Sequence, residues 1–125
     1  MYDFDKDLVR EIVNQIYDAV CTIATRTKGV ESASFFTDSP DGMEKLDGVC
    51  MLFIAIGESL KNVDKITNKT LLANHSEIDW AGIKGFRDIM AHHYFDVDAE
   101  QVFWICSKQL LPLEKALKKI IQDLG

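Results

Sequence analysis

The sequence predicts an all-α fold, and three observations carry this prediction. Apolar residues recur at steps of three and four along most of the chain, as they do on one face of a helix. Helix-capping signals precede three of these stretches. No segment shows the sustained alternation of apolar and polar residues that is typical of a half-buried strand. We therefore expect residues 1–125 to form a single-domain up-down bundle of four to five helices.

The first predicted helix covers Asp5 to Ala24. Its apolar stripe follows steps of four and three, with polar residues turned away from it. The following segment is polar and ends the helix at Gly29. Phe35 and Phe36 are expected to fold back onto the bundle.

The second predicted helix starts at Ser39-Pro40, a capping hydroxyl followed by proline, and extends to about Val63. Its middle, residues 49–56, is apolar on nearly every side. Such a helix is buried on more than one face, either at the centre of a small bundle or in a dimer interface. Gly57 would let another helix approach closely. Glu58 and Lys61 are three residues apart and can form an ion pair on one face.

The third predicted helix is Trp80 to Ala91, capped by Asp79. It follows a polar segment, residues 64–76, in which one helical turn is expected at Leu71-Leu72. Gly82 and Gly85 weaken the third helix but again permit close contact.

A fourth helix opens at Asp98, where Asp98-x-x-Gln101 forms a capping box, and it continues to about Gln109. A short irregular link, residues 94–97, precedes it. Pro112 breaks or kinks this helix and can start a fifth, because proline lacks the amide hydrogen that the helix ladder needs.

The composition is that of a globular protein, with 47% hydrophobic and 27% charged residues, and its net charge is −6. An acidic chain is a poor general coat for nucleic acid, which requires concentrated lysine and arginine. It leaves room for a small local basic site, and it also fits a basic protein partner. Three separated cysteines without a C-x-x-C motif argue against a disulfide framework or a zinc site. No secretory signal and no membrane-length apolar run is evident, so we expect a cytoplasmic protein.

The segment of residues 85–98 contains a cluster of side chains that are suited to binding and catalysis. Arg87 is followed by four residues and then His92, and one residue later by Tyr94. Arginine can clamp a phosphate with two hydrogen bonds, histidine can move a proton near neutral pH, and tyrosine can donate, stack or be modified. Together these residue types suit phosphate chemistry.

The spacing Arg-x4-His-x-Tyr resembles the motif of the HepT-like toxins, which belong to the HEPN superfamily. The resemblance runs from about Met43 to the C-terminus, and its elements occur in order with the expected spacing. The matching elements are Ile56-Gly57-Glu58-Ser59-Leu60-Lys61, Ile78-Asp79-Trp80, Ile83, Gly85, Tyr94-Phe95, Val97-Asp98 and Val102.

The resemblance implies an endoribonuclease that cleaves RNA without metal, by attack of the ribose 2′-hydroxyl on phosphorus. Arg87 would hold the phosphate, and His92 would act as general acid or base. Asp88 and His93 would support them. Asp88 stands where the family often has asparagine, and it either opposes the phosphate or orients Arg87. The resemblance also implies a homodimer, in which two motifs face one cleft.

The resemblance further implies a toxin–antitoxin pair. The antitoxin partner, a small MNT-type nucleotidyltransferase, would transfer AMP from ATP onto Tyr94, and ATP would belong to that partner rather than to this chain. We therefore expect no cofactor here. The alternative is a non-cleaving HEPN module that docks with a nucleotidyltransferase.

Each motif residue also has a plain structural interpretation. Arg87 alone would be a surface ion-pair partner, His92 a helix-end histidine, and Tyr94 a core plug. On one unbroken helix Arg87 and His92 would also point apart, so convergence requires the helix to end near His92 or a second copy of the site. The histidine pair with a nearby aspartate is a poor metal site, and His75 is expected to be solvated.

Overall fold

The computed structural model describes residues 3–125, and within that range it contains helices and no strand. The prediction of an all-α fold is therefore confirmed. The helices are α1 (Lys6–Arg26), α2 (Ser34–Thr37), α3 (Pro40–Ile66), α4 (Trp80–His92), α5 (Ala99–Lys108) and α6 (Leu110–Leu124), with 3-10 turns η1 (Leu72–Asn74) and η2 (Tyr94–Asp96).

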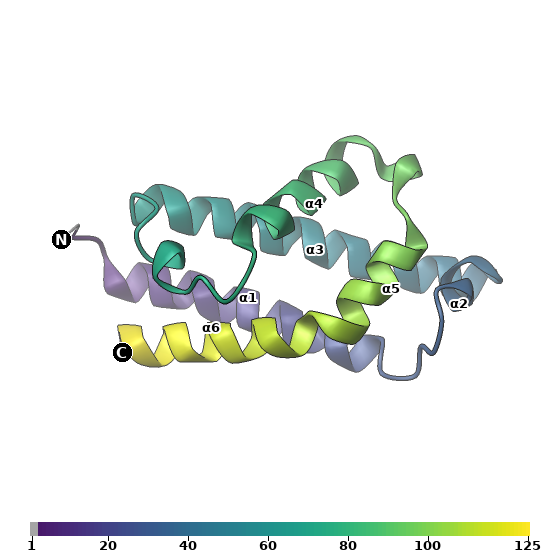
Figure 1. The fold of residues 1–125 in the computed structure, drawn as a ribbon, viewed down its shortest axis with the longest axis horizontal. Coiled ribbons are helices and arrows are strands. Elements are labelled where there is room, and N and C mark those ends of the chain that lie inside the picture. The colour runs from purple at the N-terminus through teal and green to yellow at the C-terminus, as the bar shows by residue number, and fades with distance from the viewer. Residues whose placement is uncertain (1–2) are drawn as a thin grey trace.

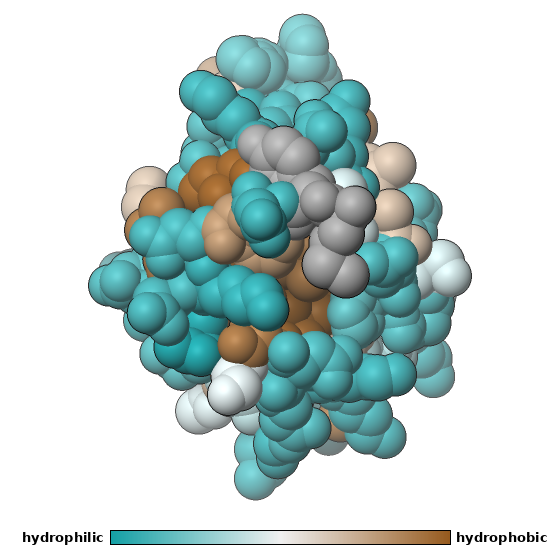
Figure 2. Space-filling view, turned by 90° about the vertical axis from the view of Figure 1, so that its left-hand side faces the viewer, coloured by the Kyte–Doolittle hydropathy of each residue, from teal (hydrophilic) through white to brown (hydrophobic). Residues whose placement is uncertain are grey.

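Helices α1, α3 and α6 lie side by side, and α1 runs opposite to α3 and α6 (Figure 1). Helix α4 crosses α3 obliquely (Figure 1). Helix α1 packs against both α3 and α6, and α4 packs against α3. Helix α1 begins and α6 ends at the same end of the bundle (Figure 1). Hydrophilic side chains cover most of that end, with an apolar strip between them (Figure 2). This arrangement leaves one side of α3 available to α4, which carries the candidate site.

Capping side chains fix the helix starts as predicted. Ser39 Oγ accepts a hydrogen bond from the amide of Gly42 at 3.0 Å, and Pro40 opens α3. Asp79 caps α4 through the amide of Gly82 at 2.9 Å. Both bonds satisfy amides that have no partner within the first turn of a helix. Asp98 caps α5, although its carboxylate accepts from the amide of Glu100 and not in the expected capping box.

The core forms where the apolar stripes of the helices meet. Helix α1 contributes a row of β-branched residues that are at most 2% exposed, in line with the predicted stripe. That row consists of Val9, Val13, Ile16, Val20 and Ile23. Phe36 folds back into the same core from α2, while Phe35 beside it is exposed.

The described residues form six α-helices, where four to five were expected, because the Phe35-Phe36 segment folds into the short helix α2. The break between α5 and α6 falls at Gln109 and not at Pro112. Proline disturbs the turn before it, where it clashes with a carbonyl and donates no hydrogen bond. Helix α1 ends at Arg26, before Gly29, and Thr27 caps it.

His75 is buried, with 6% of its surface exposed, so the prediction of a solvated histidine was wrong. The loop around it turns inward because Trp80 Nε1 donates a hydrogen bond to the His75 carbonyl at 2.9 Å. Within residues 3–125, no helix combines the length and hydropathy needed to cross a bilayer.

Candidate functional site

Arg87 lies on the face of α4 that packs against α3, and only 18% of its side chain is exposed. Gly57 on α3 makes this position possible. A Cβ at residue 57 would lie 2.5 Å from Arg87 Cγ and still closer to Arg87 Cβ. The expected close approach at Gly57 is therefore confirmed. At Gly82 a Cβ would meet the capping carboxylate of Asp79, and at Gly85 nothing lies within 4 Å, so neither glycine serves a helix contact.

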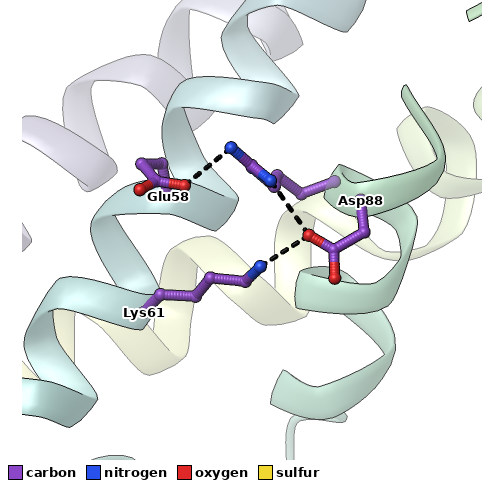
Figure 3. Close-up of polar contacts among 4 residues, drawn as sticks. Glu58, Lys61 and Asp88 are labelled. Atoms are coloured by element: carbon purple, nitrogen blue, oxygen red, sulfur yellow. Dashed lines mark hydrogen bonds and ion pairs between the residues drawn. The ribbon is translucent and has the colours of Figure 1, made fainter. Parts of the chain in front are cut away.

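Carboxylates from both helices hold the guanidinium of Arg87. Nη2 lies 2.8 Å from Oε2 of Glu58, and Nη1 lies 3.0 Å from Oδ1 of Asp88. Lys61 Nζ lies 2.5 Å from the same Asp88 oxygen, as Figure 3 shows. Hydrogen bonds from Lys61 and from Arg87 hold the pKa of Asp88 below its usual range. Arg87 Nε is buried and has no hydrogen-bond partner within the described chain.

This arrangement contradicts one prediction and bears on another. Glu58 and Lys61 do not pair with each other, because each reaches across to α4 and takes a partner there (Figure 3). Asp88 touches Arg87 directly, which is the geometry expected of a residue that orients the guanidinium. The two cations and two carboxylates have formal charges that sum to zero, so the cluster is electrically balanced in the single chain.

His92 and His93 stand at the end of α4. His92 is its last residue and His93 is its C-cap. Both side chains are exposed, and within residues 3–125 neither ring makes a hydrogen bond or an ion pair. The helix is unbroken from Arg87 to His92, so these side chains point about 140° apart around its axis. One chain therefore does not bring the arginine and the histidine to a common face.

Tyr94 folds back onto α3 from η2, and its hydroxyl donates a hydrogen bond to the carboxylate of Asp47. Partial burial is the main reason why the pKa of Tyr94 is raised above its ordinary value, and the hydrogen bond to Asp47 raises it further. Cys50 lies beside the phenol, and burial raises the pKa of its thiol to about 11. The tyrosine remains 37% exposed, so it is not the core plug that its plain structural interpretation described. Phe95 next to it is fully exposed.

The Tyr94 and Arg87 contacts share one face of α3. Asp47 contacts the tyrosine and Glu58 contacts the arginine. Asp47 and Glu58 are eleven residues apart, which is about 20° more than three full turns of a helix, so their side chains point in nearly the same direction. The two contacts are separated by about 16 Å along the α3 axis. Met51, which is 70% exposed, lies between them on this face. Sequence reasoning did not identify Asp47, although its spacing from Glu58 on a predicted helix already placed both on one face.

The described residues contain no group of three histidine, cysteine, aspartate or glutamate side chains arranged to hold a metal ion. All three cysteines, Cys21, Cys50 and Cys106, are free thiols.

The fold and the site define a small all-α protein with an arginine and a histidine on one helix and a tyrosine just beyond it. A sequence model of the family described as "Ribonuclease HepT-like" matches residues 7–120, and the chain belongs to this family.

A curated relative gives a shorter match. It is the protein of Caldanaerobacter subterraneus subsp. tengcongensis named "Putative RNase TTE0752", which is 36% identical over 67 residues. The match covers 54% of this chain and 56% of the relative, so it spans just over half the length of each protein. No solved structure matches the chain.

Proposed function

We propose that this chain is a metal-independent endoribonuclease and the toxin of a toxin–antitoxin pair. Its membership of the Ribonuclease HepT-like family supports the reaction class. The observation that carries the proposal is the placement of the motif: a partly buried arginine fixed over Gly57, followed on the same helix by an exposed histidine. Arginine is suited to grip a phosphate, and a free imidazole is suited to proton transfer.

In the proposed reaction the ribose 2′-oxygen attacks the adjacent phosphorus and loses its proton to one imidazole. The bond from phosphorus to the 5′-oxygen breaks, and the leaving oxygen takes a proton. The products are a 2′,3′-cyclic phosphate and a 5′-hydroxyl end. Arg87 stabilises the charge on the phosphate oxygens as the attack proceeds. General acid–base catalysis by His92 contributes about 10²–10⁴-fold to the rate. Asp88 orients Arg87, and His93 contacts the RNA beside it.

A homodimer supplies the convergence that one chain lacks. A two-fold axis crossing α3 midway between Asp47 and Glu58 would set the Tyr94 end of one chain opposite the Arg87 end of its partner. The face between them carries Met51, 70% exposed, and the half-buried Ile54, which suit an apolar contact. Two copies of His92 would also provide one base and one acid.

Tyr94 is the proposed acceptor of AMP, transferred from ATP by a partner nucleotidyltransferase of the MNT type. Tyr94 is 37% exposed, and a hydrogen bond to Asp47 fixes the position of its hydroxyl. An added AMP would place a negative phosphate beside the motif and repel RNA.

The test is cleavage of RNA by the purified protein in the presence of a chelator. We expect the wild type to cleave and Arg87→Ala and His92→Ala to lose at least about 10²-fold in rate. Lys118→Ala, which removes an exposed cation from α6, is the matched control and should cleave normally. Intact mass on the same sample reports whether Tyr94 already carries AMP.

A second function is favoured by one observation, the pairing of Arg87 with two carboxylates. An arginine neutralised in this way suits a HEPN module that docks with a nucleotidyltransferase and does not cleave RNA. Protein of unmodified mass that fails to cleave RNA would select this function over the first.

A further inference from the structure

An open groove of about 700 Å³ lies between the end of α3, the turn after it, and α4. Four of its nine lining residues are lysines. Three of them come from α3 and the turn after it, and one comes from α4. We call this surface the lysine groove. It is lined by Lys61, Asp64, Lys65, Asn68, Lys69, Ala81, Lys84, Gly85 and Asp88.

The charge of the lysine groove is opposite to that of the chain. Four lysines and two aspartates give its lining a formal charge of +2, whereas the whole chain carries −6. Asp64 pairs with Lys84, and Asp88 pairs with Lys61. Lys65 and Lys69 are exposed, and among residues 3–125 no carboxylate lies within ion-pair distance of either. The groove thus presents two cations that are available to an anionic ligand.

The turn after α3 returns Lys69 to the groove at a conformational cost. Asn68 and Lys69 have φ angles of 52° and 62°, in the left-handed region. The amide of Lys69 donates to the carbonyl of Asp64 at 2.8 Å, which closes the turn. Glycine would adopt this conformation without the steric penalty that a Cβ brings. The backbone conformation at residue 69 is therefore less favourable for lysine than for glycine. The lysine, however, places a positive charge in the groove.

The lysine groove is continuous with the candidate site. Asp88 lines the groove, and its Oδ1 also accepts from Arg87 Nη1 at 3.0 Å. Lys61, the other partner of that oxygen, stands one helical turn before Lys65, about 6 Å away along the α3 axis. A strand whose phosphate lay at Arg87 would therefore have cations beside its next phosphates.

We propose that the lysine groove binds the sugar–phosphate backbone of single-stranded RNA next to the phosphate held by Arg87. This proposal rests on the proposed function, because that function puts an RNA phosphate at Arg87. The groove adds sequence-independent attraction to an acidic protein, and it assigns Lys65 and Lys69 as backbone contacts that take no part in bond breaking.

The experiment measures binding separately from cleavage. The ligand is a short fluorescein-labelled oligouridine whose 2′-hydroxyls are methylated, so that it has no attacking group. Its dissociation constant is followed by anisotropy as the sodium chloride concentration is varied. The variants are Lys65→Ala/Lys69→Ala and, as a backbone-compatible change at the strained position, Lys69→Gly. The control is Lys118→Ala/Lys119→Ala on α6.

We expect the groove double variant to bind about five- to ten-fold more weakly, with its salt slope reduced by about 1.4, or about 0.7 for each lost phosphate contact. Lys69→Gly should show about half the change in slope, and the α6 control none. Unchanged affinity and slope in the groove variants would overturn the proposal. So would absence of RNA binding by the wild type, an outcome that would make a protein surface the partner of the groove.

The two proposals fail separately. If the wild type does not cleave RNA but binds the methylated strand through Lys65 and Lys69, the groove stands and the ribonuclease falls. If the wild type cleaves and the groove variants bind and cleave equally well, the ribonuclease stands and the groove falls.

Discussion

Replacing Gly57 with alanine tests whether the close approach of α4 to α3 is what fixes Arg87. The added methyl would lie 2.5 Å from Arg87 Cγ and closer still to Cβ. These atoms are the stem of the side chain, which cannot swing away unless the two helices move apart. Inserting a methyl group into a packed contact costs about 1–3 kcal/mol.

A helix-propensity gain opposes this cost. Exchanging glycine for alanine inside a helix stabilises it by about 0.8–1 kcal/mol. The balance for Gly57→Ala is a net loss of up to about 2 kcal/mol, or about 1 kcal/mol at the middle of the range. Gly85→Ala provides the matched control, because Gly85 is also helical but has nothing within 4 Å of its virtual Cβ. It should gain about 0.5–1 kcal/mol.

Urea unfolding followed by circular dichroism, at one fixed protein concentration, measures both variants. We expect their free energies of unfolding to differ by about 2 kcal/mol in favour of Gly85→Ala, or about 6–10 °C in Tm for a domain of this size. RNA cleavage should fall in Gly57→Ala at temperatures where it remains folded. Equal stability of the two variants would refute the packing argument.

Three further predictions concern residues whose pKa is shifted from its ordinary value. Because burial raises the pKa of Cys50 and Cys106 to about 11, both thiols should react with iodoacetamide near neutral pH roughly 100-fold more slowly than an ordinary thiol, as timed by mass spectrometry. Tyr94 should ionise above the pH of a free tyrosine in an ultraviolet absorbance titration, and Asp47→Asn should lower that pH by removing the nearby charge. The pKa of Asp88 is lowered in the folded chain, so its stabilising contribution is present above the unfolded pKa and is lost as pH falls through the folded pKa. Asp88→Asn should therefore reduce the loss of stability as the pH falls below about 4, measured by thermal melts.

Most of the fold could be predicted because its signals are local. Ser39-Pro40 and Asp79 start helices through hydrogen bonds to amides three residues away, and α1 shows its buried stripe in its own spacing. Gly57 was also readable as a point of close approach. Such signals depend only on residues that are close together in the sequence, so they can be recognised without knowing which helix packs against them.

The partners of the site could not be predicted, because they depend on which helices meet. Glu58 and Lys61 had the correct spacing to pair with each other, yet both reach to α4 once Gly57 has brought it close. Asp47 finds Tyr94 only because η2 folds back onto α3. His75 was wrongly placed in solvent for the same reason, since its burial depends on how the loop closes over the core.

The charge balance around Arg87 determines which carboxylate an RNA phosphate would displace under the proposed function. Asp88 is tied to both Lys61 and Arg87, whereas Glu58 has Arg87 as its only ion-pair partner among residues 3–125, and 63% of its side chain is exposed. A phosphate arriving at the guanidinium would therefore replace Glu58 more easily and leave Asp88 to hold the orientation.

Glu58→Gln should then tighten binding of the methylated oligouridine by about two- to five-fold, because it removes a competing charge from an exposed pair. Asp88→Asn should instead slow cleavage through a less well oriented Arg87. Weaker binding by Glu58→Gln, comparable to that of Arg87→Ala, would mean that Glu58 positions the guanidinium and does not compete with the phosphate.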